Sequence, residues 1–136
     1  MTQYLLDTNI CVFFLRGKES IKEEILFKGV DNCFISEITV AELLYGVECD
    51  EYNFNENRRK VNEFIEILQI IPITNVLLEY AQQKATLRKS GNLIDDMDLF
   101  IGATAIVNNM VLVTSNEKHL KRLSNIKIEN WLQSTN

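Results

Sequence analysis

Short apolar runs alternate with stretches of helical spacing along this sequence, and the alternation limits the folds that the chain can adopt. Strand-like runs occupy residues 4–6, 33–35, 70–73 and 111–113, with a fifth candidate at 127–129. Between them lie segments such as 61–68, where apolar side chains recur at i, i+3, i+4 and i+7. Strands that alternate with helices predict an α/β fold, with a mainly parallel sheet of four to five strands flanked by helices on both sides.

Capping residues mark where several of these helices begin and end. Ser36 follows the second apolar run and is placed to cap a helix over residues 38–48, and Thr74 is placed to cap a helix that ends near residue 90. Gly91 suits the left-handed position just after that second helix. Pro72 lies in the third run and predicts a strand at the edge of the sheet, or one that ends there.

Length and composition favour a single globular unit. The chain has 136 residues with five Gly and one Pro, so we expect one domain over residues 1–136 without an internal linker. Cys11, Cys33 and Cys49 lie too far apart in the sequence for a zinc or redox pair and are expected to be reduced core residues. The sequence lacks a signal-peptide or membrane-spanning pattern, which predicts a soluble cytoplasmic protein without membrane association.

The charge balance excludes one mode of nucleic-acid binding. The chain carries 14 basic and 19 acidic residues, for a formal net charge of −5. Proteins that hold nucleic acid by neutralising many phosphates need a basic surface. Any binding of RNA by this chain must therefore be local.

Polar side chains follow the predicted strands at the points where the strands end. Asp7 comes after the first run, Glu42 lies early in the helix after the second, Asp98 opens a helix, and Asn116 follows the fourth run. The carboxyl ends of parallel strands share one edge of a sheet, so these side chains are expected to lie close together. Glu42 stands in an apolar helix and Asp98 precedes nine uncharged residues, and buried carboxylates of this kind need a cation. Oxygen ligands without His or Cys favour Mg²⁺, with Mn²⁺ as the other possibility.

Each of these residues also has an ordinary structural interpretation. Asp7 could cap the helix that starts near Asn9, and Asn116 could begin a helix in the same way. Glu42 could pair with a Lys or Arg folded over it. Asp95 and Asp96 are interpreted as helix caps and partners of the helix dipole instead of ligands.

Other catalytic chemistries find less support in the sequence. A nucleophilic triad would have to use His119, the only histidine, which lies in a Lys-rich segment typical of a solvated helix face. Cys11 and Cys33 have apolar neighbours and are expected to be unreactive. The sequence has no Gly-rich phosphate-binding loop of the Walker or dinucleotide pattern.

Four motifs together resemble one family. YLLDTN at residues 4–9, SEITVAELLYG at 36–46, GNLI with DLFIGATA at 91–94 and 98–105, and VLVTSN at 111–116 are similar to those of PIN-domain nucleases. Within that family the chain resembles VapC-type toxins of bacterial type II toxin–antitoxin systems. The resemblance extends over nearly the whole chain, including residues 126–131.

The resemblance implies a PIN-like domain that acts as a Mg²⁺-dependent endoribonuclease. Asp7, Glu42 and Asp98 match the metal-binding acids of the family, and Asn116 stands where a fourth acid is common, with Glu117 next to it. The resemblance leaves open whether one metal ion or two are bound. Thr8, Asn9, Thr114 and Ser115 would be the polar groups that orient the acids. Water as the nucleophile implies products with 5′-phosphate and 3′-hydroxyl ends.

The resemblance also implies partners. A cognate antitoxin, a homodimer and an RNA substrate are expected, the first guess for the RNA being a tRNA anticodon stem-loop whose cleavage inhibits translation. The apolar segment 11–15 and the helix after it suit one wall of a groove for the antitoxin. Candidate phosphate contacts, each of which could equally be a solvated side chain, are Lys84, Arg88, Lys89, Lys118, Lys121 and Arg122.

Two other functions compete with this interpretation. A phospho-receiver signalling domain is also a small α/β protein with clustered acids, but it needs an Asp at the end of the third strand, where Ile73-Thr74-Asn75 stands here. A PIN-like binding module without catalysis is the other alternative, because Asn116 departs from the acidic pattern.

Overall fold

The computed structural model describes residues 1–132, so the last four residues of the expected domain lie outside the described part. Its centre is a five-stranded sheet in the order β3-β2-β1-β4-β5, and every neighbouring pair is parallel. The strands are β1 (Tyr4–Leu6), β2 (Cys33–Ser36), β3 (Gln69–Ile71), β4 (Val111–Val113) and β5 (Ile128–Glu129). This confirms the predicted α/β class, the parallel sheet and its number of strands.

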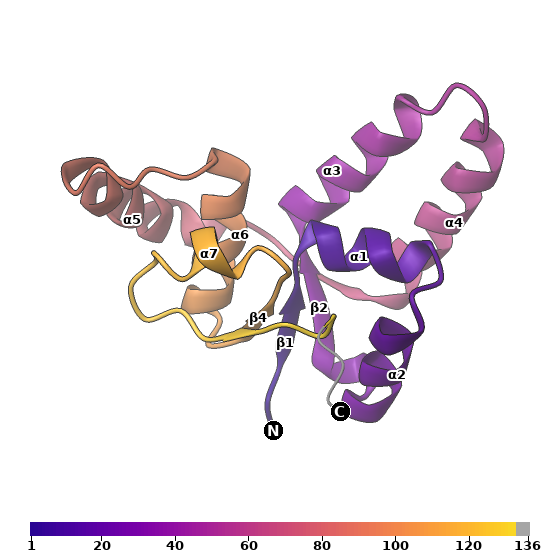
Figure 1. Cartoon of the computed structure of the whole chain (residues 1–136), viewed down its shortest axis with the longest axis horizontal. Helices are drawn as coiled ribbons and strands as arrows, with labels where there is room; N and C mark the ends of the chain where they lie inside the picture. The colour runs from indigo at the N-terminus through magenta and orange to yellow at the C-terminus, as the bar shows by residue number, and fades with distance from the viewer. Residues whose placement is uncertain (133–136) are drawn as a thin grey trace.

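Seven α-helices connect and surround these strands (Figure 1). They are α1 (Thr8–Leu15), α2 (Glu19–Lys28), α3 (Glu37–Glu48), α4 (Phe54–Ile67), α5 (Leu77–Lys89), α6 (Asp96–Val107) and α7 (Glu117–Leu120), all within residues 1–132. Figure 1 shows α1 to α4 on one side of the sheet and α5 to α7 on the other, as the expected helices on both sides require.

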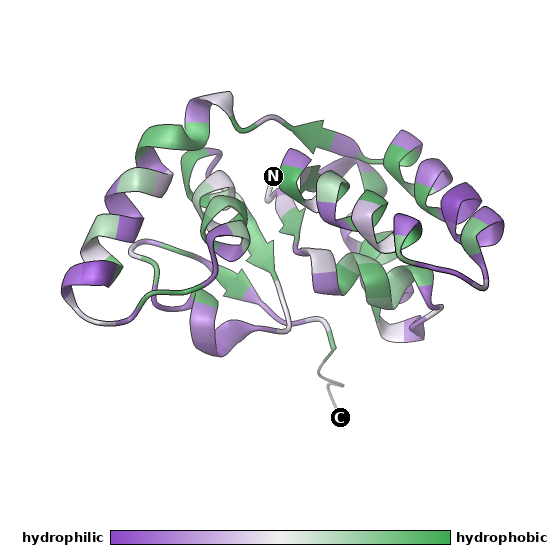
Figure 2. Ribbon diagram, turned by 90° about the horizontal axis from the view of Figure 1, so that it is seen from above, coloured by the Kyte–Doolittle hydropathy of each residue, from purple (hydrophilic) through white to green (hydrophobic). Residues whose placement is uncertain are grey.

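Two apolar clusters hold these layers to the sheet. Leu6 and Ile35 pack against residues of α1 to α4, whereas Leu5, Phe34 and Leu112 pack against residues of α5 to α7. Successive residues of a strand point to opposite faces, so β1, β2 and β4 each supply both clusters. Figure 2 accordingly shows mostly hydrophobic strands between helices that carry recurring hydrophilic residues.

The strand order places a switch point beside β1. The chain runs from β1 outward to β2 and β3, and then returns to the other side of β1 to form β4. Open α/β sheets bind their ligands at the carboxyl ends of the strands where the order reverses in this way. Asp7 follows β1 directly, and its backbone N–H donates to the carbonyl of Val113 at the end of β4 (2.9 Å).

Several sequence-based expectations about the helix and strand ends are confirmed. Ser36 caps α3, Pro72 follows β3 at the edge of the sheet, and Gly91 has a positive φ of 72° just after α5. Thr74 was wrongly expected to cap α5: it opens a 3-10 turn, Thr74–Val76, and no side chain caps the helix. In this turn the backbone N–H of Val76 donates to the carbonyl oxygen of Ile73 (2.9 Å). The chain therefore changes direction before α5 without a side-chain cap.

The cysteines follow the prediction in part. Cys11 and Cys33 are buried free thiols, but Cys49 is exposed, so its placement in the core was wrong. Cys49 follows the last residue of α3, where the chain turns toward α4 at the surface. Within the described part of the chain, no helix combines the length and the apolar character that a membrane crossing requires.

Candidate active site

Asp7 is a helix cap and also a buried carboxylate. It is the N-cap of α1, and its Oδ1 accepts from the backbone N of Thr8 at 2.7 Å. Oδ2 accepts from the hydroxyl of Thr114 at 2.7 Å and from the amide of Asn9 at 3.3 Å. The side chain is only 2% exposed. Asp7 is therefore held in one orientation at the switch point.

Glu42 reaches the same region from α3. Ser36 accepts from the backbone N of Ile38 (2.9 Å) and Thr39 (3.4 Å), which fixes the first turn of the helix. One turn later, Glu42 Oε1 accepts from the hydroxyl of Thr8 at 2.7 Å. The bond joins α3 to the first residue of α1, next to Asp7.

Thr39 is a site residue that the motif analysis missed. Its side chain is fully buried, and its hydroxyl lies 3.0 Å from that of Thr8. Thr8 has a single hydroxyl proton, which the Glu42 carboxylate takes, so the Thr39 hydroxyl must supply the proton between the two threonines. The available signal was a polar residue three positions before Glu42, on the same side of the helix.

Asp98 and Asn116 complete the cluster from the other side of the sheet. Asp98 lies in the first turn of α6, and Asn116 Nδ2 donates to its Oδ2 at 3.4 Å. The backbone N of Asn116 donates to Thr114 Oγ1 (2.9 Å), the hydroxyl that donates in turn to Asp7. These bonds link Asp98 to Asp7 through Asn116 and Thr114, which both follow β4.

Asp7, Glu42 and Asp98 repel one another, and burial removes water from the carboxylates of Asp7 and Asp98. Burial raises the pKa of Asp7, and Glu42 raises it further, although hydrogen bonds from Thr114, Thr8 and Asn9 oppose this. Burial also raises the pKa of Asp98, to about 6, with repulsion from Asp7, Asp95 and Glu42 in the same direction and the bond from Asn116 opposing it. Over residues 1–132 no Lys, Arg or His forms an ion pair with Asp7, Glu42 or Asp98.

The donor set therefore suits a divalent cation. Carboxylate and amide oxygens are the ligands that Mg²⁺ and Mn²⁺ prefer, and the negative charge lacks a cation from the described protein. In the same part of the chain, however, no three Asp, Glu, His or Cys side chains are close enough to hold a metal ion where they stand. The residue types fit a divalent metal, but these carboxylates do not form a closed metal shell.

Other polar residues near the strand ends have separate roles. Asn9 Oδ1 accepts from the backbone N of Ser115 (3.3 Å), so Ser115 supports the site through its backbone. Asn130 donates to the carboxylate of Glu117 (3.4 Å), whereas Asn116 donates to Asp98. Asp95 caps α6, as predicted.

The six candidate phosphate contacts fall into two groups. Lys84 pairs with Asp96 at 2.8 Å, and Arg122 donates to the carbonyl oxygens of Asn92 and Leu93, both at 3.4 Å. These two cations therefore hold the segment between α5 and α6. Of the six candidates, Arg88, Lys89, Lys118 and Lys121 are exposed and have no ion pair in the described structure.

Comparisons with known proteins agree with the motifs and the fold. Residues 4–126 match the PIN domain family. The chain is 35% identical to "Ribonuclease VapC2" of Rickettsia felis over 131 residues, which are 94% of this chain and 97% of that protein. It is 32% identical over 133 residues to the "tRNA(fMet)-specific endonuclease VapC" of Salmonella typhimurium, with 96% and 99% of the two chains covered.

Solved structures show the same similarity in three dimensions. The chain superimposes on the crystal structure of DNA-bound VapBC from Salmonella typhimurium with a TM-score of 0.90 and 32% identity. The superposition covers 96% of this chain and 99% of the other. On its sequence, its sheet topology and these matches, the chain belongs to the PIN domain family and, within it, to the VapC ribonucleases.

Proposed function

We propose that this VapC-family endoribonuclease is a Mg²⁺-dependent toxin of a bacterial toxin–antitoxin pair and acts on RNA in the cytoplasm. One observation carries the proposal: Asp7, Glu42 and Asp98 gather at the carboxyl edge of the sheet, and no cation of the described chain neutralises them. A phospho-receiver domain is not supported, because β3 is followed by Pro72 and Ile73 where that class needs a carboxylate.

The chain's own residues prepare the site for hydrolysis. A divalent cation held by Asp7, Glu42 and Asp98 would polarise the phosphodiester and lower the pKa of a water molecule. Thr114 and the α1 backbone hold Asp7, while Thr8 holds Glu42. Asn116 orients Asp98 through its amide. With water as the nucleophile, we expect 5′-phosphate and 3′-hydroxyl product ends.

For the substrate we propose a tRNA, with the anticodon stem-loop as the cleaved element. The Salmonella typhimurium relative is a tRNA(fMet)-specific endonuclease, and this chain is 32% identical to it. The net charge of −5 argues against broad phosphate binding, so a local set of cations must hold the RNA. Four of the candidate phosphate contacts are exposed and unpaired within residues 1–132: Arg88 and Lys89 lie at the end of α5, Lys118 lies in α7, and Lys121 follows α7. Cleavage of such a tRNA would inhibit translation.

For the partner we propose a cognate antitoxin that binds beside α1. The matched Salmonella typhimurium structure is a VapBC complex, which supports such a partner here. α1 is apolar over most of its length, and Val12, Phe13, Phe14 and Leu15 are only partly buried. A homodimer stays a prediction, which light scattering of the purified chain would test.

The first experiment compares Asp7→Asn and Asp98→Asn with the wild type on total RNA and on purified tRNA. Either change removes a proposed metal ligand, and we expect cleavage to fall by about 100-fold or more, since loss of outer-shell partners alone costs about 10–100-fold. Asp31→Asn is the matched control because Asp31 is exposed and precedes β2, at the opposite edge of the sheet. EDTA should abolish wild-type cleavage, and added Mg²⁺ should restore it.

Three results would contradict the proposal. Full cleavage in EDTA would exclude the metal, and cyclic-phosphate ends would exclude water as the nucleophile. RNA binding without cleavage by the wild type would instead identify a silent binding module. Circular dichroism of each variant checks that loss of activity is not loss of folding.

A further inference from the structure

Asp98 is held by fewer contacts than the other two acids of the site. Asp7 accepts two hydrogen bonds of 2.7 Å, and Glu42 accepts one of the same length. Within residues 1–132 the one hydrogen bond to the Asp98 side chain comes from Asn116, at 3.4 Å. Asp98 also lies in the first turn of α6, and the ends of a helix open more easily than its middle. The position of Asp98 therefore depends mainly on how α6 itself is held.

Tyr80 holds the start of α6 at two points. It lies on α5, which packs beside α6 (Figure 1). Its ring stacks on Phe100, with centroids 3.9 Å apart and an angle of 4° between the ring planes. Its hydroxyl donates to Asp96 Oδ1 at 2.8 Å. Asp96 and Phe100 are four positions apart and share one face of α6, so Tyr80 bridges a complete turn of the helix.

Lys84, one turn after Tyr80 on α5, determines the direction of the tyrosine's proton. Its ammonium donates to Asp96 Oδ1 at 2.8 Å and to the Tyr80 hydroxyl at 3.3 Å. A lysine ammonium only donates, so the Tyr80 oxygen must accept from it, and the tyrosine's own proton is left for Asp96. The three side chains thus form a closed ring of hydrogen bonds, which holds the Tyr80 hydroxyl in one orientation.

The contacts of Tyr80 and the side chain of Asp98 lie on different faces of α6. An α-helix turns by roughly 100° per residue, and Asp98 is two positions from both Asp96 and Phe100. Its side chain therefore leaves α6 roughly opposite to the face that Tyr80 covers, and there it accepts from Asn116. A rotation of α6 about its axis would break the contacts with Tyr80 and turn Asp98 away from the other acids at the same time.

We propose that Tyr80 is a positioning residue for Asp98, because its ring on Phe100 and its hydroxyl on Asp96 fix the rotation of α6. This inference rests on the proposed metal-dependent function and names a residue that prepares the site for the metal. In this role Tyr80 touches neither the substrate nor the metal and acts through α6. Asp96 and Lys84 belong to the same support, since they bind and orient the tyrosine hydroxyl.

An RNA base is a poorer explanation for this aromatic pair. Bases stack on aromatic rings that present a free face, but Phe100 covers one face of Tyr80 and both residues are partly buried. The Tyr80 hydroxyl and the Asp96 carboxylate are also engaged with each other and with Lys84. The contacts of the pair lie within the protein, which favours positioning over direct recognition of RNA.

The test removes only the hydroxyl. Tyr80→Phe keeps the stacked ring and changes no charge, and Tyr52→Phe is the matched control because Tyr52 is 91% exposed between α3 and α4. Isothermal titration calorimetry measures Mg²⁺ binding without RNA, and cleavage assays give kcat and KM. We expect Tyr80→Phe to weaken Mg²⁺ binding by about 10-fold, as loss of an outer-shell partner does, and to lower kcat without changing KM. Tyr52→Phe should match the wild type.

A double-mutant cycle locates the effect in the bond to Asp96. Asp96→Ala removes the acceptor and should also weaken Mg²⁺ binding. Because the hydroxyl acts through Asp96, adding Tyr80→Phe to Asp96→Ala should cause no further loss of Mg²⁺ affinity. Additive losses would contradict the proposed bridge.

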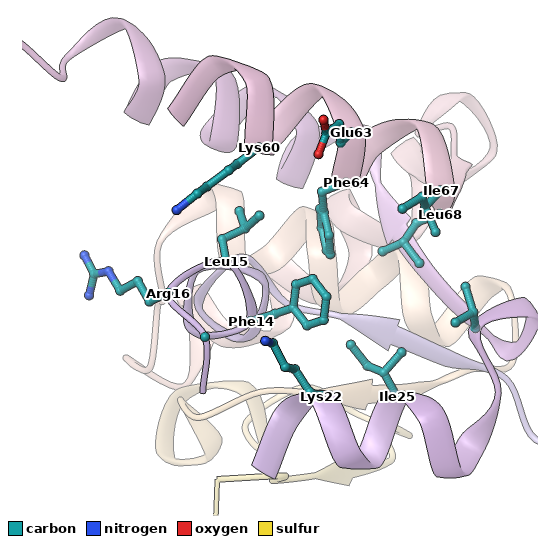
Figure 3. Close-up of a pocket in the computed structure, with 12 residues that line it drawn as sticks. Phe14, Leu15, Arg16, Lys22, Ile25, Lys60, Glu63, Phe64, Ile67 and Leu68 are labelled. Carbon is teal, nitrogen blue, oxygen red and sulfur yellow. The ribbon is translucent and has the colours of Figure 1, made fainter. Parts of the chain in front are cut away.

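A second control separates positioning from a general loss of stability. Phe14 of α1 and Phe64 of α4 line a cavity of about 490 Å³ and face each other in it, with ring centroids 5.2 Å apart (Figure 3). Both belong to the apolar cluster on the other side of the sheet from Tyr80. Phe64→Leu should lower Tm and leave Mg²⁺ affinity unchanged. An equal fall of Mg²⁺ affinity in Phe64→Leu and Tyr80→Phe would assign the effect to stability and overturn the proposal.

The remaining outcomes separate this inference from the function on which it rests. Equal Mg²⁺ binding by Tyr80→Phe and the wild type would overturn the positioning role and leave the nuclease function intact. A higher KM for RNA with unchanged Mg²⁺ binding would overturn it in favour of direct contact between Tyr80 and the substrate. A wild type that neither binds Mg²⁺ nor cleaves RNA would instead contradict the proposed metal-dependent function itself.

Discussion

A single hydroxyl proton decides how Glu42 is held. Thr8 Oγ1 lies 2.7 Å from Glu42 and 3.0 Å from Thr39, and it can donate to only one of them. The carboxylate is the stronger acceptor, so Thr39 donates to Thr8 and strengthens the bond from Thr8 to Glu42. Thr39 is therefore a positioning residue that acts on Glu42 through Thr8.

Thr39→Val should lower kcat by about 10-fold with little change in KM, since partners of this kind contribute about 10–100-fold to activity or metal affinity. Thr104→Val is the matched control: Thr104 is equally buried, but its hydroxyl donates to the carbonyl of Phe100 in its own helix. Single-turnover kinetics and the Mg²⁺ concentration for half-activity measure the effect. Thr39→Ser should restore both values. Equal losses of kcat in Thr39→Val and Thr104→Val would mean that Thr39 contributes only packing.

At the scale of the element, α3 connects the sheet to the active site. Ser36 ends β2 and caps α3, and Thr39 and Glu42 follow within the first two turns. The cap thus controls the position of two site residues. The same arrangement recurs in α6, where Asp95 caps the helix and Asp98 lies in its first turn.

Ser36→Ala should lower the free energy of unfolding by about 1 kcal/mol, the usual cost of losing a helix cap. Ser20→Ala is an informative control, because Ser20 Oγ is buried without a hydrogen-bond partner among the described residues. Its removal should leave stability unchanged or raise it. Urea unfolding of the two variants measures the difference. Unchanged stability of Ser36→Ala would mean that the cap at Ser36 does not stabilise α3.

At the scale of the whole molecule, much of the net negative charge lies in the cluster of Asp7, Glu42 and Asp98, where it opposes folding. Setting aside the three proposed ligands leaves 16 of the 19 acidic residues against 14 basic ones, so much of the −5 belongs to the site. Because repulsion and burial raise the pKa values of Asp7 and Asp98, the metal-free site opposes folding at neutral pH. A bound divalent cation would remove this cost.

The metal-free protein should therefore lose stability as pH rises through about 6. The pKa of Asp98 is about 6 in the folded state against an ordinary value of 3.8, so the folded state binds the proton more tightly and is favoured below that range. Asp98→Asn should have a higher Tm than the wild type in EDTA at pH 7, and the difference should narrow as the pH falls from about 6 toward 3.8. Asp31→Asn should not show this pattern. A lower Tm for Asp98→Asn at pH 7 would contradict the repulsion.

The sequence by itself determined the fold class and the residues of the acidic cluster. Apolar runs and helical spacing are local patterns, and they located the central strands because β1, β2 and β4 contribute to both cores. The acids Asp7, Glu42 and Asp98 were identifiable because parallel strands end at one edge. The wrong cap at Thr74 reflects the weakness of local signals at helix ends, where a short turn competes with a cap.

Only the tertiary structure decided which of these side chains touch. Thr39 joins Glu42 through a residue 31 positions away, and Lys84 and Arg122, two of the candidate phosphate contacts, bond to the α5–α6 segment. Such contacts join residues that are distant in the chain, and no local spacing specifies them, because packing sets the distances between elements.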